Sequence, residues 1–136
     1  MSIKHKFTSA QADGGDTSVV RPSNWNDDHQ VTSFTAAKVP VAFSATPSFD
    51  ASLGNSFKMT LTGNITSMTF SNLTDGQEIT LLFVQDGTGN HTVAWPAAVK
   101  GGIDFGGAAI LPNAIVTQKF HVDGTTLIAL APGTVN

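Results

Sequence analysis

Four histidines and two small aspartate clusters are the residues in this chain that could bind a metal ion. His91 and His121 fall in segments that alternate like β-strands, and no two histidines have the close spacing that brings both imidazoles to one metal. The Asp-Asp-His run at 27–29 could collect a cation, as could Asp13 with Asp16, but neither has the regular oxygen ligands of a calcium loop. We therefore predict no metal site and no cofactor.

Covalent catalysis would need a nucleophile, a base and an orienting group brought together. Serines, histidines and aspartates are present, but no nucleophile-elbow motif surrounds any serine, and there are no cysteines. The glycine-containing QDGTGNH at 85–91 lacks the Lys-Ser/Thr ending of a phosphate loop and a following helix, so we interpret it as a tight hairpin connection. The sequence predicts that the protein is not an enzyme.

The charge and hydropathy patterns exclude two further classes of partner. Lysine and arginine number 7 against 10 acids, for a net charge of -3, and the cations are scattered singly rather than clustered as phosphate binding requires. No segment approaches the roughly 20 apolar residues of a membrane span, and no apolar run follows the N-terminal charges. We expect no nucleic-acid or membrane partner, and a chain that is made in the cytoplasm and stays there or leaves by a route that needs no signal peptide.

Short segments alternate apolar and polar residues, which is the period of a β-strand with one buried face. In FKMTLTG, Phe57, Met59 and Leu61 fall on one side, and SMTFSNL at 67–73 repeats the pattern. The TGN at 62–64 between these segments is short enough for a hairpin. These two segments therefore predict adjacent antiparallel strands.

The rest of the C-terminal part continues this β pattern. EITLLFVQ at 78–85 is apolar on both faces, as in a central strand covered on both sides. HTVAWP follows, and then IVTQKFHV and TLIALA are joined at Asp123-Gly124, a strong hairpin signal. A single glutamate and thirteen glycines disfavour long helices. We predict an all-β fold: one antiparallel, jelly-roll-like β-sandwich over residues 41–136.

Residues 1–40 alternate poorly and predict an extended N-terminal arm. The arm contains the polar stretch VRPSNWNDDH at 20–29, in which Trp25 has no strand or helix pattern around it. A large ring on such a segment needs a partner surface, either on the β domain or on another molecule, where aromatic and arginine side chains often anchor interfaces.

Two aromatic residues of the β domain have alternative interpretations. Trp95, in VAWPAAV, either closes the end of the sandwich, with Pro96 ending the strand, or stacks on a sugar ring. Phe105 lies in the glycine-rich GGIDFGGAAILP, which is either a flexible rim or a contact between subunits. Trp95 and Phe105 are therefore candidate glycan or subunit contacts.

Several motifs in one order resemble small virion and tail-appendage proteins of tailed bacteriophages. The N-terminal segment HKFTSAQADGGDTSVVRPSNWNDDH at 5–29 resembles their N-terminal signature. LTGN, the GQ before the central strand, QDGTG and WP resemble marks of a β domain found in the same proteins, and KFHVDGTTLIAL at 119–130 resembles its closing hairpin. The resemblance implies a non-enzymatic, oligomeric structural protein whose arm docks on the virion and whose β domain faces outward.

Under this resemblance we predict a minor capsid or decoration (cement) protein on the virion surface. A fibre would need a long repetitive shaft, which 136 residues without an internal repeat do not supply. We expect copies to associate as trimers and to dock on the major capsid protein or other virion proteins. The expected docking residues are Arg21, Pro22, Trp25, Asn26 and His29. The alternative is a tail-fibre or receptor-binding module that recognises host-surface polysaccharide.

Overall fold

The computed structural model describes residues 2–3, 10–16, 18, 21, 29–30, 38–105, 110–131 and 134–135. The chain divides into two compact units, Met1–Thr35 and Ala36–Asn136. In the first unit, β1 (Ser2–Ile3) pairs antiparallel with β2 (His29–Gln30). The second unit is the β domain and is described by itself below.

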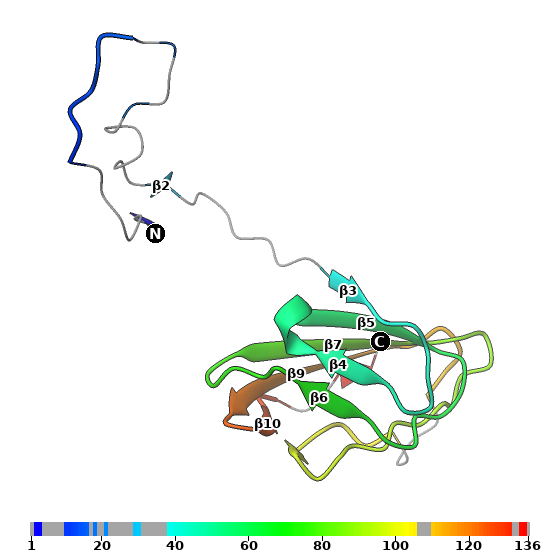
Figure 1. The fold of residues 1–136 in the computed structure, drawn as a ribbon. Coiled ribbons are helices and arrows are strands. Elements are labelled where there is room, and N and C mark those ends of the chain that lie inside the picture. Colours follow the sequence, from blue (N-terminus) through cyan, green and yellow to red (C-terminus); the bar gives the residue numbers. More distant parts are fainter. Residues whose placement is uncertain are drawn as a thin grey trace. The chain divides into compact units, whose positions relative to one another are not determined.

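The β domain has nine strands and a short 3-10 turn among its described residues, and no α-helix (Figure 1). In chain order these are β3 (Lys38–Pro40), β4 (Ser48–Asp50), η1 (Ala51–Leu53), β5 (Ser56–Leu61), β6 (Thr69–Ser71), β7 (Glu78–Gln85), β8 (Val99–Lys100), β9 (Ile115–Asp123), β10 (Thr126–Ala129) and β11 (Thr134–Val135). The all-β prediction is therefore confirmed for this part of the chain. Because β3 belongs to the sheet, the sheet begins before residue 41, within the segment predicted as the arm.

The first part of the domain winds like a short β-solenoid, which we call the coil. Strands β3, β5 and β7 lie parallel on one side, with Lys38 opposite Ser56 and Ser56 opposite Thr80; we call this side the long face. Strands β4 and β6 are parallel on another side, the short face. Between these faces Ile65 pairs in parallel with Val93. Each turn of the coil therefore stacks on the turn before it.

An antiparallel hairpin continues the sheet by pairing with the free edge of β7, the last strand of the long face. Strand β9 pairs with β7 from Glu78 opposite His121 to Val84 opposite Ile115, and β10 follows β9. The β9–β10 loop is two residues long and begins with Gly124, whose φ of +59° is the left-handed value that a type II′ turn requires at this position. The predicted hairpin at Asp123-Gly124 is confirmed.

The predicted antiparallel, jelly-roll-like sandwich is not what the strands form, because parallel and antiparallel pairs are mixed in one sheet of order β3-β5-β7-β9-β10-β8. The hairpin predicted at 62–64 is wrong, since β5 pairs with β3 and β7 while β6 pairs with β4. The loop at 85–91 is likewise no hairpin connection, since it leads to the parallel bridge at Val93. Alternation shows which side chains are buried, but it does not identify the neighbouring strand.

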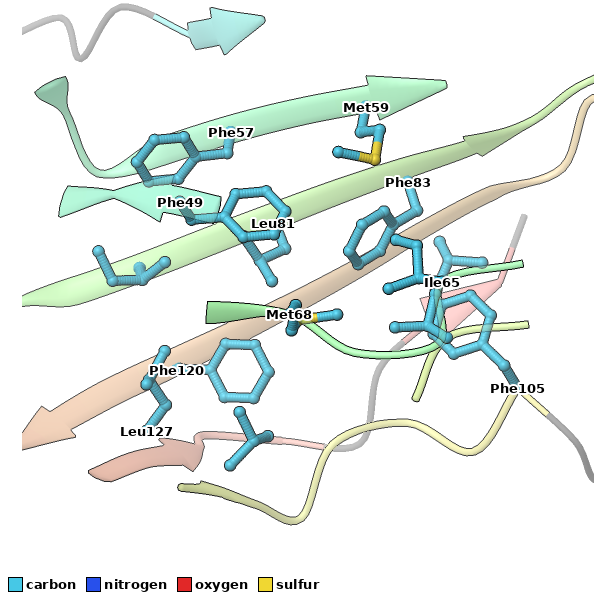
Figure 2. Close-up of a cluster of buried hydrophobic side chains, with 14 of the residues drawn as sticks. Phe49, Phe57, Met59, Ile65, Met68, Leu81, Phe83, Phe105, Phe120 and Leu127 are labelled. Atoms are coloured by element: carbon cyan, nitrogen blue, oxygen red, sulfur yellow. The ribbon is translucent and has the colours of Figure 1, made fainter. Parts of the chain in front are cut away.

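The core lies between the inner side of the main sheet and the short face with its adjoining loops (Figure 2). In β5 alternate residues are buried, as the sequence pattern predicts, and β7 also buries every second residue. The outward residues Leu82 and Val84 are only half-buried, so β7 is central in the sheet but not covered on both sides. Phe49 of β4 packs edge-on against Phe57 and Phe83, with ring centroids 5.7 and 6.4 Å apart, and thereby joins the two faces.

Candidate functional site

The predicted docking residues lie in the first unit, and the structure describes few of them. Arg21 is half-buried, and its Nε donates a hydrogen bond to the backbone oxygen of Asp16 at 3.2 Å. Pro22, Trp25 and Asn26 lie outside the described residues, and His29 is described only through its backbone in β2. Docking through these residues therefore stays a prediction.

Trp95 and Phe105 are part of the aromatic core. The Phe105 ring is buried, and it packs edge-on against Phe83 with centroids 5.9 Å apart. The Trp95 ring packs against Phe83, Phe105 and Phe120, and its Nε1 donates to the backbone oxygen of Ile103 at 2.8 Å. This geometry favours the structural interpretation of Trp95, while Phe105 has little surface to offer a partner.

The candidate site is the loop pair, which we define as residues 86–91 and 110–113 at the end of β7 and the start of β9. Buried Gln85 holds the first loop, because its side-chain amide pairs with the backbone of His91 through two 2.9 Å hydrogen bonds. Asp86 follows, and its Oδ1 accepts the N–H groups of Thr88 and Gly89 and lies 3.0 Å from His91 Nε2. One amide and one carboxylate therefore set the shape of this loop.

These hydrogen bonds change the titration of the carboxylate. The Thr88 N–H is the main cause of a lowered pKa for Asp86, and partial burial opposes it. The hydrogen bonds from His91 and from the Gly89 N–H lower this pKa further. The loop is consequently braced by an ionised Asp86 at neutral pH.

The two loops contact each other closely. Asn90 donates its N–H to Ile110 O at 2.8 Å and accepts the Ile110 N–H on its side-chain oxygen at 3.0 Å. Gly89 has a φ of +71°, and a Cβ there would lie 2.7 Å from Pro112 N and 2.8 Å from Ile110 O. Only glycine fits this approach without a shift of the backbone. The loop pair is therefore a defined surface in spite of its irregular backbone.

The outer surface of the loop pair combines polar and apolar groups. Thr88, Asn90 and Asn113 are exposed, and Leu111 is the most exposed large hydrophobic residue in the described part of the chain, at 70 %. Hydroxyl and amide groups beside an apolar side chain suit a neutral, hydroxyl-rich ligand such as a sugar chain. The described residues contain no cluster of His, Cys, Asp and Glu able to hold a metal ion.

The sequence interpretation missed two buried glutamines, Gln85, which holds the first loop of the pair, and Gln118, which holds backbone groups elsewhere in the domain. Gln118 accepts the Ile103 N–H at 3.2 Å and donates to the backbone oxygens of Lys119 and Ala131. Both Gln85 and Gln118 occupy inward positions of their strands, where alternation calls for apolar residues. A glutamine at a core position of an otherwise alternating strand is the signal that could have identified them.

Comparison with known families gives the class of the protein. A family model described as "Putative phage tail fibre C-terminal domain" matches residues 45–126, which is more than half of the chain. The chain belongs to this family, and it is a structural component of a bacteriophage virion of the tail-appendage kind. Searches of curated proteins and of solved structures found no match.

The family favours the tail-fibre alternative over the predicted capsid decoration protein. The capsid prediction depended on the lack of a repetitive shaft, but the terminal domain of a fibre needs no shaft of its own. In the described part of the chain, no helix is long and apolar enough to cross a membrane.

Proposed function

We propose that this protein is a non-enzymatic tail-fibre component whose β domain presents the loop pair to polysaccharide on the host surface. The observation that carries the proposal is the match of residues 45–126 to a tail-fibre C-terminal domain, because that range contains both loops. Binding at loops on a rigid β scaffold is a common arrangement in recognition proteins. The bracing of the loop pair by Gln85 and Asp86 supports this role, since a preformed surface loses less entropy on binding.

We assign attachment to the virion to the N-terminal arm, with Arg21, Pro22, Trp25, Asn26 and His29 as its contacts. The two functions then lie in the two units of the chain and are separable by mutation. The partners of the arm are other virion proteins.

We further propose that copies of the chain associate, as trimers. Ile115 and Ile128 point away from the core on β9 and β10 and are 41 % and 40 % exposed, which supports packing between copies on this side of the sheet. Sedimentation equilibrium of the full chain tests the trimer, and a monomer at every concentration would contradict it.

Phage carrying Leu111→Glu test the proposed host contact. We expect their adsorption rate to fall by about tenfold, the effect of losing one central apolar contact. Their content of this protein should equal wild type, because Leu111 is exposed. The matched control is Leu53→Glu, since Leu53 is 66 % exposed in η1, outside the loop pair. Unchanged adsorption of both Leu111→Glu and Thr88→Trp phage would contradict a host contact at the loop pair.

Trp25→Ala tests the attachment through the arm. We expect particles that lack this protein, while the free variant still competes with phage for host cells. Wild-type occupancy on particles, for this variant and for a deletion of residues 1–30, would exclude docking through the arm.

A further inference from the structure

The short face of the coil has one strand fewer than the long face. On the long face β3, β5 and β7 stack in three successive turns, whereas on the short face the described residues place only β6 beside β4. After Val93 the chain turns away through Trp95 and Pro96, and β8 pairs with β10 instead of β6. One edge of β6 therefore has no neighbouring strand.

The backbone of Phe70 points to this open edge. In a parallel pair, a residue directs its N–H and C=O to one side and the next residue directs them to the other. The Thr69 N–H donates to Pro47 O at 3.0 Å, so Thr69 faces β4 and Phe70 faces away from it. Among the described residues, neither backbone group of Phe70 has a hydrogen-bonding partner. This strand thus offers one donor and one acceptor at its open edge.

A groove of about 460 Å³ lies along this edge. Its other wall comes from the segment before β8 and from the β9–β10 hairpin, and none of its lining residues is charged. Phe70 is half-buried and stacks on Phe49 with centroids 5.4 Å apart. The lining also includes Leu73 and Pro96, which are half-buried, and Ala98 and Thr125, which are exposed.

We propose that this groove is a strand-addition site, which binds an extended, uncharged segment of another virion protein as a third strand beside β6. The main chain of the segment bonds to the N–H and C=O of Phe70, and its alternate side chains contact the apolar walls at Leu73 and Pro96, which are both half-buried. Recognition of a peptide through an open strand edge next to side-chain pockets is an established binding mode. The proposal does not depend on host contact at the loop pair.

The absence of charge in the groove indicates which kind of segment it binds. Among the other open edge strands of the β domain, β3, β4 and β8 each carry a charge, at Lys38, Asp50 and Lys100, and the uncharged β11 has only two described residues. Placing a charged group of a second copy against an uncharged apolar wall is costly, so these edges match the groove poorly. A sugar chain has no amide backbone to pair with Phe70. A neutral extended peptide from a different protein matches both features.

Amide hydrogen exchange and chemical shifts of the ¹⁵N-labelled full chain test the proposal. In the free protein we expect the Phe70 amide to exchange faster than the Thr69 amide. The probe is the peptide acetyl-Thr-Val-Thr-Val-Thr-amide. We expect its addition to shift the amides around Phe70, Leu73 and Ala98 and to slow exchange at Phe70 by about tenfold, the effect of one added hydrogen bond.

Matched probes and variants define the site. The same peptide methylated at each internal nitrogen should bind about tenfold more weakly or not at all, because it cannot donate to the strand. Ala98→Glu should block binding, and exposed Thr125→Glu serves the same purpose if Ala98→Glu does not fold. Ala97→Glu is the control, because Ala97 is exposed next to Ala98 but outside the lining.

Four results would overturn the proposal. The first is equal protection of the Phe70 and Thr69 amides in the free protein, and the second is equal binding of the methylated peptide. The third is protection of the Phe70 amide that rises with protein concentration alone, and the fourth is a set of shifts at the groove with host polysaccharide but not with the peptide. The third would assign the groove to a second copy, and the fourth to a glycan.

Discussion

The two faces of the coil end differently. The long face gains a further neighbour when β9 pairs along β7, whereas the short face ends at β6. In β7 every second side chain is buried, while β6 contributes only the half-buried Phe70 to the core. The pairing of β9 with β7 thus extends the long face into a larger sheet, whereas the short face ends at β6 and leaves one strand edge open to a partner.

The largest expected difference between the faces is in core stability. Phe83 of β7 contacts Phe49, Trp95 and Phe105, and it is almost completely buried. We expect Phe83→Ala to lower the free energy of unfolding by about 3–5 kcal/mol, because it leaves a cavity in the aromatic core. Denaturation by urea, followed by tryptophan fluorescence, measures this loss.

The matched substitution on the short face is Phe70→Ala. Because this ring is half-buried, we expect a loss of about 1–2 kcal/mol. Equal losses for the two variants would show that β6 contributes to the core as much as β7 does, and the comparison between the faces would then fail.

The sequence alone predicted much of the long face and little of the short one. Alternation identified β5 and its buried side, because burial on one face leaves a period of two. The apolar run at 78–85 identified β7 as a central strand, and the Asp-Gly turn identified the β9–β10 hairpin, but the prediction that both sides of β7 are covered was wrong. The neighbours of β6 could not be predicted, since strand order depends on loops whose path has no local pattern.

The candidate site was predicted only in part. The 85–91 segment was predicted to be a tight hairpin connection, which is wrong, and its contact with 110–113 depends on the left-handed backbone of Asn90 and on the space beside Gly89. Neither feature is visible in the sequence alone. Trp95 was predicted either to close the end of the sandwich or to stack on a sugar ring, and its packing against Phe83 and Phe120 favours the first interpretation.

The second expected difference is in the loss of stability when a glutamine at the end of each face is replaced. Gln85 at the end of β7 is buried, so Gln85→Leu leaves the N–H and C=O of His91 without partners. We expect a loss of about 2–3 kcal/mol, the cost of unsatisfied buried polar groups. Thermal unfolding followed by circular dichroism measures this change.

Gln77, between β6 and β7, is the control for this prediction. It also makes side-chain hydrogen bonds, to Ala51 O and Asn55 Oδ1, but it is only half-buried. Water can replace its partners, so Gln77→Leu should cost about 1 kcal/mol or less. A larger loss for Gln77→Leu than for Gln85→Leu would reverse the predicted order of the two faces.

The smallest expected difference appears at acid pH, where one carboxylate beside each face becomes protonated: Asp50 beside the short face and Asp86 beside the long face. The Asn72 amide, followed by the hydroxyl and N–H of Ser52, lowers the pKa of Asp50, as the Thr88 N–H lowers that of Asp86. A carboxyl group whose pKa is lower in the folded state stabilises that state above its unfolded pKa, near 4, and this contribution disappears as pH falls through the lower, folded pKa. Both effects should therefore be seen below about pH 4.

The location of the response separates the two carboxylates. Among the described residues the Asp86 carboxylate bonds only within its own loop, so its protonation should speed amide exchange at Thr88 and Gly89. Asp50 holds Asn72 at 2.8 Å and so connects β4 to the end of β6, and its protonation should speed exchange at Asn72 and Leu73 beside the groove. Asp50→Asn and Asp86→Asn should each remove the acid response at its own site and leave the other unchanged. A response at both sites in either variant would mean that the two faces open together, and the short face would then be no more independent than the long one.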